Sequence, residues 1–142
     1  MLVFGGKEPD SGGDVDGHFV PGISVLDYEN LRWEEPGTRG TPPAPRVSHC
    51  ACVDRDSHLY IFGGRAETAK GESELKNDLW CLTYAGATET WSWQQITASG
   101  APPSPRWGAT ICGEGRKAWR RDRTITCTLG TAPHCTRAGR SQ

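Results

Sequence analysis

Residues 33–46 read WEEPGTRGTPPAPR, and sixty residues later residues 93–106 read WQQITASGAPPSPR. A tryptophan, a Gly-x-Pro-Pro-x-Pro-Arg turn and the spacing between them all recur. Recurrence at a fixed offset is typical of proteins in which one structural unit is stacked on the next. The sequence therefore predicts a repeated unit that presents loops from a scaffold.

A short apolar segment that ends in two glycines also occurs twice, as LVFGG at residues 2–6 and as LYIFGG at residues 59–64. Successive side chains of a strand face opposite ways, so Leu59 and Ile61 share one face while Tyr60 and Phe62 share the other. Because both faces are apolar, we expect this strand to be covered on both sides by neighbouring sheets. The glycines that we expect to shape the following turns are Gly5, Gly6, Gly63 and Gly64.

Each copy of the unit has room for four short strands. Besides the glycine strand, we expect strands at residues 23–27 and 79–83, 31–34 and 91–96, and 46–51 and 106–111. Four strands in a unit of this length is the count for one blade of a β-propeller.

Four landmarks in order resemble a kelch repeat: Pro-Arg-Val-Ser-His ending at His49, the glycine strand, Asp-Leu-Trp ending at Trp80, and then Trp93. Most of these landmarks occur twice, and the resemblance covers roughly residues 2–112. It implies an all-β propeller of several four-stranded blades. Such propellers serve most often as protein-binding platforms and sometimes as substrate receptors of ubiquitin ligases.

The strands account for only part of a propeller ring. They supply the last three strands of one blade, a complete blade at about residues 46–96, and the first strand of a third blade. Closed propellers have about four to eight blades. We therefore predict a partial kelch-type β-propeller over residues 1–112, with one complete four-stranded blade and parts of two neighbours.

The end of the chain has a different character. Residues 106–142 carry eight basic and two acidic side chains, although the net charge of the whole chain is −1. Residues 119–124, where a third glycine strand would lie, read WRRDRT, and arginines on both faces of a strand cannot be buried cheaply. We expect residues 113–142 to be an unrelated, disordered basic tail. We do not expect this tail to bind a nucleic acid.

Cysteine usage and the N-terminus bear on location. The six cysteines include no Cys-x-x-Cys pair, and MLVFGG is too short for a signal peptide. We interpret the cysteines as reduced thiols in a cytoplasmic protein. No apolar run approaches the roughly 18 residues of a membrane span, so we expect no membrane partner.

The sequence contains no convergent set of catalytic residues. Nucleophile-elbow, P-loop and dinucleotide-binding patterns are absent. The four histidines are not spaced as zinc ligands, and Asp10, Asp14 and Asp16 lack the closing glutamate of a calcium loop. We expect His49 to have a structural hydrogen-bonding role, and we predict a chain that is not an enzyme and has no metal or cofactor.

Partner contacts are expected in the two long polar stretches, residues 7–22 and 65–77, because loops are free of packing constraints. The mixed-charge candidates for binding another protein are Lys70, Glu72, Glu74 and Lys76.

The repeat landmarks have a structural interpretation. We expect Trp33 and Trp93 to wedge between adjacent blades, where each would bury a large apolar area. We expect Arg46 and Arg106, at matching positions after the prolines, to tie a loop to backbone carbonyls or to a neighbouring blade.

These observations favour a non-catalytic protein-interaction module with a substrate-recognition or scaffold role. One alternative is the propeller portion of a larger enzyme, either similar to copper radical oxidases or fused to a catalytic domain. A second alternative is a truncated product without function, because a blade with open edges tends to aggregate.

Overall fold

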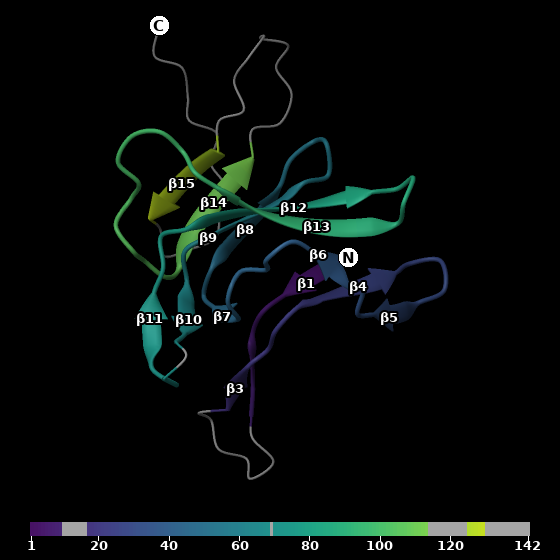
Figure 1. Cartoon of the computed structure of the whole chain (residues 1–142), viewed down its shortest axis with the longest axis horizontal. Helices are drawn as coiled ribbons and strands as arrows, with labels where there is room; N and C mark the ends of the chain where they lie inside the picture. The colour runs from purple at the N-terminus through teal and green to yellow at the C-terminus, as the bar shows by residue number, and fades with distance from the viewer. Residues whose placement is uncertain (10–16, 69, 114–124, 130–142) are drawn as a thin grey trace, which may run out of the picture.

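The computed structural model describes residues 1–9, 17–68, 70–113 and 125–129, and all regular elements in this part are β-strands (Figure 1). The predicted all-β class is confirmed. Among these residues no helix is long and apolar enough to cross a membrane.

The first sheet is antiparallel and has the order β1-β4-β5, with β1 at Leu2–Phe4, β4 at Ile23–Asp27 and β5 at Arg32–Glu34. These are the three expected strands of the first blade. Between β1 and β4 the chain forms a small hairpin of β2 (Lys7–Glu8) and β3 (His18–Phe19). Asp10, Asp14 and Asp16 lie outside the described residues.

The second sheet is the complete four-stranded blade. Its order is β8-β9-β12-β13, with β8 at Cys50–Val53, β9 at Leu59–Phe62, β12 at Leu79–Ala85 and β13 at Thr90–Ile96. The short strand β6 (Thr38–Arg39) joins the outer edge of β13 in parallel, with Thr38 opposite Trp91. The polypeptide that leaves the first blade therefore also pairs with the second.

Two local features differ from the prediction. The strand expected at residues 46–51 is divided into β7 (Arg46–Val47) and β8, because Ser48 between them adopts a left-handed conformation with φ of 53°. The polar stretch after Gly64 is a hairpin rather than an open loop, with β10 at Arg65–Glu67 and β11 at Ser73–Leu75, and β7 pairs with β10.

The third sheet contains β14 (Ala109–Gly113) and β15 (Ile125–Leu129), which pair antiparallel. Residues 125–129 lie within the segment that we expect to be a disordered tail, and they take the place beside β14 that a glycine strand would occupy in a regular repeat. A five-residue stretch, ITCTL, is rich in β-branched residues and suits a strand. The basic cluster around Trp119 lies outside the described residues.

The core consists of two clusters, one on each side of the second sheet. Leu59 and Ile61 pack toward the first sheet with Phe4, whereas Tyr60 and Phe62 pack toward β14 and its Ile111. The expectation that the glycine strand is covered on both faces is confirmed.

The two repeat tryptophans differ in burial. Trp93 is 5 % exposed within the first cluster, whereas Trp33 is 51 % exposed. The expected burial of Trp33 between blades is wrong for the described chain, because its face of the first sheet has no other sheet against it in the described residues.

Candidate partner-binding face

The paired glycines connect each blade to the next. Gly6 donates its backbone N–H to the carbonyl of Arg46 at 3.1 Å, and Gly64 donates to the carbonyl of Arg106 at 2.8 Å. Gly63 has a φ of 65°, and a Cβ built there would lie 2.8 Å from the Arg106 carbonyl oxygen. This position therefore needs glycine for both its conformation and its close backbone contact.

Arg46 lies on β7, opposite Ala66 of β10, and is 1 % exposed. Its Nη1 and Nη2 donate to the two carboxylate oxygens of Asp78 at 2.7 and 3.0 Å, and Nη1 also donates to the Gly63 carbonyl at 2.9 Å. The indole Nε1 of Trp80 donates to the same carboxylate at 2.6 Å. A buried charge with a bidentate partner and further hydrogen bonds is a rigid support, so Arg46 ties the hairpin base to the blade.

The electrostatics of this pair favour its ionised form. Burial alone would raise the pKa of Asp78, but the hydrogen bonds from Arg46 and Trp80 outweigh burial and hold that pKa below its usual value. The carboxylate and the guanidinium are therefore both charged at neutral pH.

Arg106 stands at the matching position but has different side-chain partners. Its Nε donates to the Ser104 carbonyl at 2.9 Å and its Nη2 to the Ser104 hydroxyl at 3.0 Å. Its backbone N–H donates to the Lys76 carbonyl at 3.1 Å. Within the described residues no carboxylate forms an ion pair with Arg106, so its side chain lacks the buried support that Arg46 has.

His49 packs with its ring edge-on to Phe4, at 5.3 Å between the ring centroids. Burial and the nearby Arg46 charge lower its pKa, although a backbone hydrogen bond at Arg46 acts in the opposite direction. Its Nδ1 has no hydrogen-bond partner among the described residues. The neutral ring thus fills the space between the two blades.

The candidate binding residues lie on the β10–β11 hairpin. Its turn is held by Thr68, whose hydroxyl accepts hydrogen bonds from the backbone of Lys70 at 3.3 Å and of Glu72 at 3.2 Å. Glu74 lies on β11 and forms an ion pair with Lys76 at the hairpin base. The structure therefore pairs Glu74 with Lys76 and places Lys70 and Glu72 at the exposed tip.

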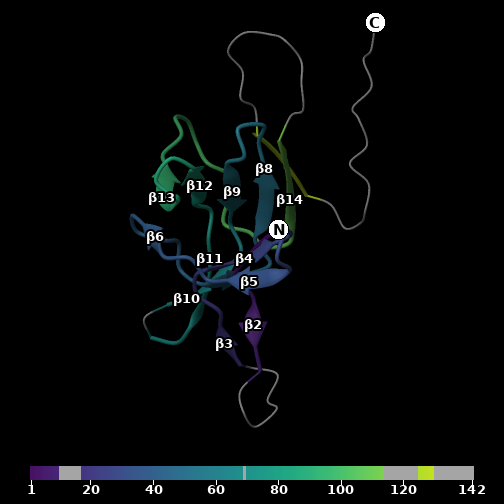
Figure 2. The same cartoon turned by 90° about the vertical axis from the view of Figure 1, so that its right-hand side faces the viewer.

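Figures 1 and 2 show that the β2–β3 and β10–β11 hairpins extend from the same end of the sheets. On the first hairpin the Lys7 ammonium lies 5.4 Å from the Phe19 ring centroid, and His18 lies 3.7 Å from Glu8. Both hairpins therefore present polar and charged side chains on one face of the partial propeller, which we call the hairpin face.

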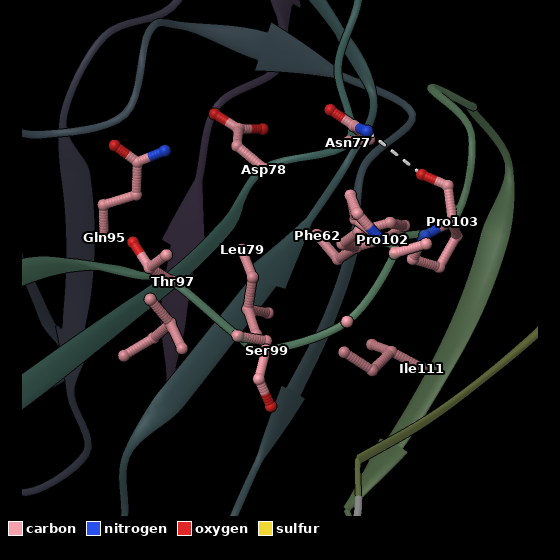
Figure 3. Close-up of a pocket in the computed structure, with 14 residues that line it drawn as sticks. Phe62, Asn77, Asp78, Leu79, Gln95, Thr97, Ser99, Pro102, Pro103 and Ile111 are labelled. Carbon is pink, nitrogen blue, oxygen red and sulfur yellow. Dashed lines mark hydrogen bonds between the residues drawn. The ribbon is translucent and has the colours of Figure 1, made fainter.

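A cavity of about 420 Å³ opens beside the base of the second hairpin (Figure 3). Its apolar wall includes Phe62, Leu79, Ile96 and Ile111. The Asn77 amide donates to the Pro103 carbonyl at 3.1 Å across its rim. The cavity lies between the second sheet and β14, and it is lined mainly by apolar side chains and by the proline-rich turn.

Sequence reasoning missed one group that could hold a metal ion. Asp54, Asp56 and His58 offer ligand atoms within 4.8 Å of one another at the β8–β9 turn. Asp54 already accepts hydrogen bonds from the backbone of Asp56 and His58, at 3.0 and 2.9 Å, and its second oxygen lies 3.1 Å from His58 Nδ1. These hydrogen bonds stabilise the β8–β9 turn, and they explain why the three side chains lie close together.

In the described residues a complete four-stranded blade lies between a three-stranded and a two-stranded antiparallel sheet, and glycine pairs connect the successive sheets. This arrangement defines a repeat protein of the β-propeller class. The family model described as the KLHDC2/KLHL20/DRC7 Kelch-repeats domain matches residues 1–120. The chain belongs to the kelch-repeat family. The match ends eight residues after the boundary expected at residue 112.

Several curated proteins are similar to this chain. The Rab9 effector protein with kelch motifs of Rattus norvegicus is 30% identical over 117 residues, covering 82% of this chain and 28% of that protein. Acyl-CoA-binding domain-containing protein 5 of Arabidopsis thaliana is 31% identical, covering 76% of this chain and 14% of that protein. Kelch domain-containing protein 2 of Bos taurus is 34% identical over 84 residues, covering 59% of this chain and 18% of that protein.

The chain thus spans less than a third of the length of these relatives. Kelch repeats are typically protein-interaction modules, and the relatives carry them next to sequence that this chain does not match.

Proposed function

We propose that this chain is a non-catalytic protein-interaction module that presents the β2–β3 and β10–β11 hairpins to a partner protein, in a recognition or scaffold role. The observation that carries the proposal is the contrast within the second hairpin. Lys70, Glu72 and Glu74 are exposed, whereas the hairpin base is fastened by the buried Arg46.

This arrangement suits binding because a rigid base lowers the entropy lost when the exposed side chains meet a partner. The tip carries both signs of charge, so it can select a partner by complementary charge rather than by bulk attraction. One relative is named as an effector of Rab9, which supports a protein as the partner. A cytoplasmic location stays a prediction.

The proposal can be tested with a pair of charge-swapped variants. Lys70→Glu with Glu72→Lys exchanges the charges of the hairpin tip without changing net charge. The control, Arg55→Glu with Glu89→Lys, does the same at two exposed turns at the other end of the blade strands. Captured proteins from a cell extract would be quantified by mass spectrometry for the wild type and for both variants.

We expect the hairpin swap to lower capture of the specific partner at least about tenfold, as removal of a well-placed charge pair does, and the control to leave it unchanged. The measurement would then be repeated as a titration with the purified partner. Equal capture by the wild type and the hairpin variant, or equal loss in both variants, would contradict the proposal.

A further inference from the structure

One apolar surface of the described chain has no sheet packed against it, and a second is only partly covered by β14. The first is the outer face of the first sheet, formed by Val3, Leu26 and Trp33, which we call the Trp33 face. Val3 is 44 % exposed and Trp33 is 51 % exposed. The second is the cavity beside Phe62 and Leu79 (Figure 3), which we call the Phe62 cavity.

The strand registers show that these surfaces are matching parts of one repeated interface. Phe4 pairs with Ile23 in the first sheet as Phe62 pairs with Leu79 in the second. Likewise, Leu26 pairs with Trp33 as Leu82 pairs with Trp93. Trp33 is therefore the equivalent of Trp93, and Phe62 is the equivalent of Phe4.

The chain contains one complete example of how these equivalents meet. Trp93 packs against Phe4, with ring centroids 5.2 Å apart, and the contact buries both residues between the first and second sheets. By the same geometry, the indole of Trp33 from a second copy fits beside Phe62. The Trp33 face and the Phe62 cavity are the two unfilled halves of this interface.

The strand edges match in the same way. In the complete blade β8 pairs with β9, and the equivalents of these strands are β14 and β1. Within the described residues the edge of β1 away from β4 has no strand beside it. In the complete blade, β6 covers the outer edge of β13. The equivalent of β6 is residues 98–99, which line the Phe62 cavity, and the equivalent of β13 is β5. Residues 98–99 of one copy are therefore placed to cover the outer edge of β5 in the next copy.

We propose that copies of this chain associate head to tail, with the Trp33 face of one copy seated in the Phe62 cavity of the next. In the single chain β15 lies beside β14, so association exchanges β15 for β1 of the neighbouring copy. The contact joins two different surfaces, and such heterologous contacts close into rings when the rotation allows it.

The strand count sets the size of the ring. The described residues of each copy contribute eight blade strands, which is two four-stranded blades: β1, β4, β5, β8, β9, β12, β13 and β14. Propellers close with about four to eight blades, so about two to four copies complete a ring.

The first test measures the mass of the full chain by sedimentation equilibrium and by light scattering. We expect a discrete particle of two to four copies for the wild type and a monomer for Trp33→Glu, whose association should weaken at least about 100-fold because a charge replaces a buried indole. Val3→Glu on the same face should act alike. The control is Val53→Glu, since Val53 is 59 % exposed and pairs with Leu59 on the second sheet, away from both surfaces.

The second test asks whether the contact is head to tail. Ile96→Glu alters the cavity side, and this variant alone should be monomeric. A mixture of the Trp33→Glu and Ile96→Glu variants retains one intact pair of surfaces and should form a 1:1 dimer that grows no further.

Circular dichroism would check that each variant is folded, which we expect for Trp33→Glu because Trp33 is already half exposed. A wild-type monomer at every concentration, a particle mass that Trp33→Glu leaves unchanged, or a mixture that does not pair would each overturn the proposal.

Discussion

Trp33 and Trp93 occupy the same position in two consecutive blades, yet Trp93 is 5 % exposed and Trp33 is 51 % exposed. Both follow a turn that joins the last two strands of a blade, and both pair with a leucine on the neighbouring strand. The difference in burial comes from the neighbouring sheet. The first sheet covers Trp93, while the described residues place no sheet over Trp33.

The comparison shows that a repeat motif specifies a position within a blade, but burial depends on the adjacent blade. The arginines differ because of their own blades. Arg46 reaches Asp78 of the complete blade that it opens, whereas the described residues hold no complete blade after Arg106, which bonds to its own turn at Ser104. Stability should therefore be concentrated in the complete blade and at its boundary with the first sheet.

The largest effect should come from Trp93→Ala. We expect it to lower the free energy of unfolding by about 3 to 5 kcal/mol, because it leaves a large cavity between two sheets. Trp33→Ala should lower it by less than about 1 kcal/mol in dilute, monomeric solution, since exposed side chains contribute little. Urea unfolding of both variants would measure the difference, and equal losses would show that burial in the described chain does not govern stability.

The arginine pair gives the next contrast. Arg46→Met should cost about 2 to 4 kcal/mol, because it leaves the Asp78 carboxylate without its buried partner, although that carboxylate keeps its bond from Trp80. Arg106→Met should cost less than about 0.5 kcal/mol. The same urea titrations would test this prediction. A loss in Arg106→Met as large as in Arg46→Met would mean that both arginines have buried partners.

Most of the blade could be predicted from the sequence, because apolar alternation and turn residues are local signals. The two-faced packing of Leu59 through Phe62 followed directly from that alternation. The bidentate bond between Arg46 and Asp78 joins residues 32 positions apart, and the sequence contains several carboxylates that could have paired with the arginine. The Asp-Leu-Trp landmark contains Asp78, but only the structure shows that Asp78, rather than another carboxylate, is the partner of Arg46.

The sequence predicted where the candidate site lies, but it did not predict the secondary structure of that site. The stretch that begins at Arg65 was expected to be exposed, and it is, but pairing of β10 with both β11 and β7 makes it a hairpin. That pairing depends on the break at Ser48, and a positive φ at a serine has no clear sequence signal. The strand at residues 125–129 was not predicted either. The arginines directly before it favoured a solvent-exposed tail over a strand.

The pH dependence of stability should separate the buried carboxylate from the exposed ones. The pKa of Asp78 is lowered in the folded chain, so its contribution is present above the unfolded value and is lost as pH falls through the folded value. For the wild type we expect the free energy of unfolding to fall below about pH 4.

Arg46→Met serves as the comparison, because burial then acts on Asp78 without the opposing hydrogen bonds and should raise its pKa. The difference in unfolding free energy between wild type and variant should therefore shrink as the pH is lowered from 5 to 3. The contributions of other carboxylates, such as Asp54, occur in both proteins and cancel. A difference that stays constant with pH would exclude Asp78 as its source.

The smallest effect should come from the hairpin face. Glu74→Gln removes the ion pair with Lys76, but the Glu74 side chain is 56 % exposed, and surface ion pairs contribute less than about 1 kcal/mol because water and salt screen them. We expect a change near zero in unfolding free energy and in its salt dependence, measured by urea titration at low and high salt. Lys76 also bonds through its backbone to Gly64 and Arg106, and the substitution leaves those bonds intact. A loss comparable to that of Arg46→Met would mean that the exposed ion pair of Glu74, as well as the buried Arg46, holds the second blade together. A partner that displaced Lys76 from Glu74 would then destabilise the fold.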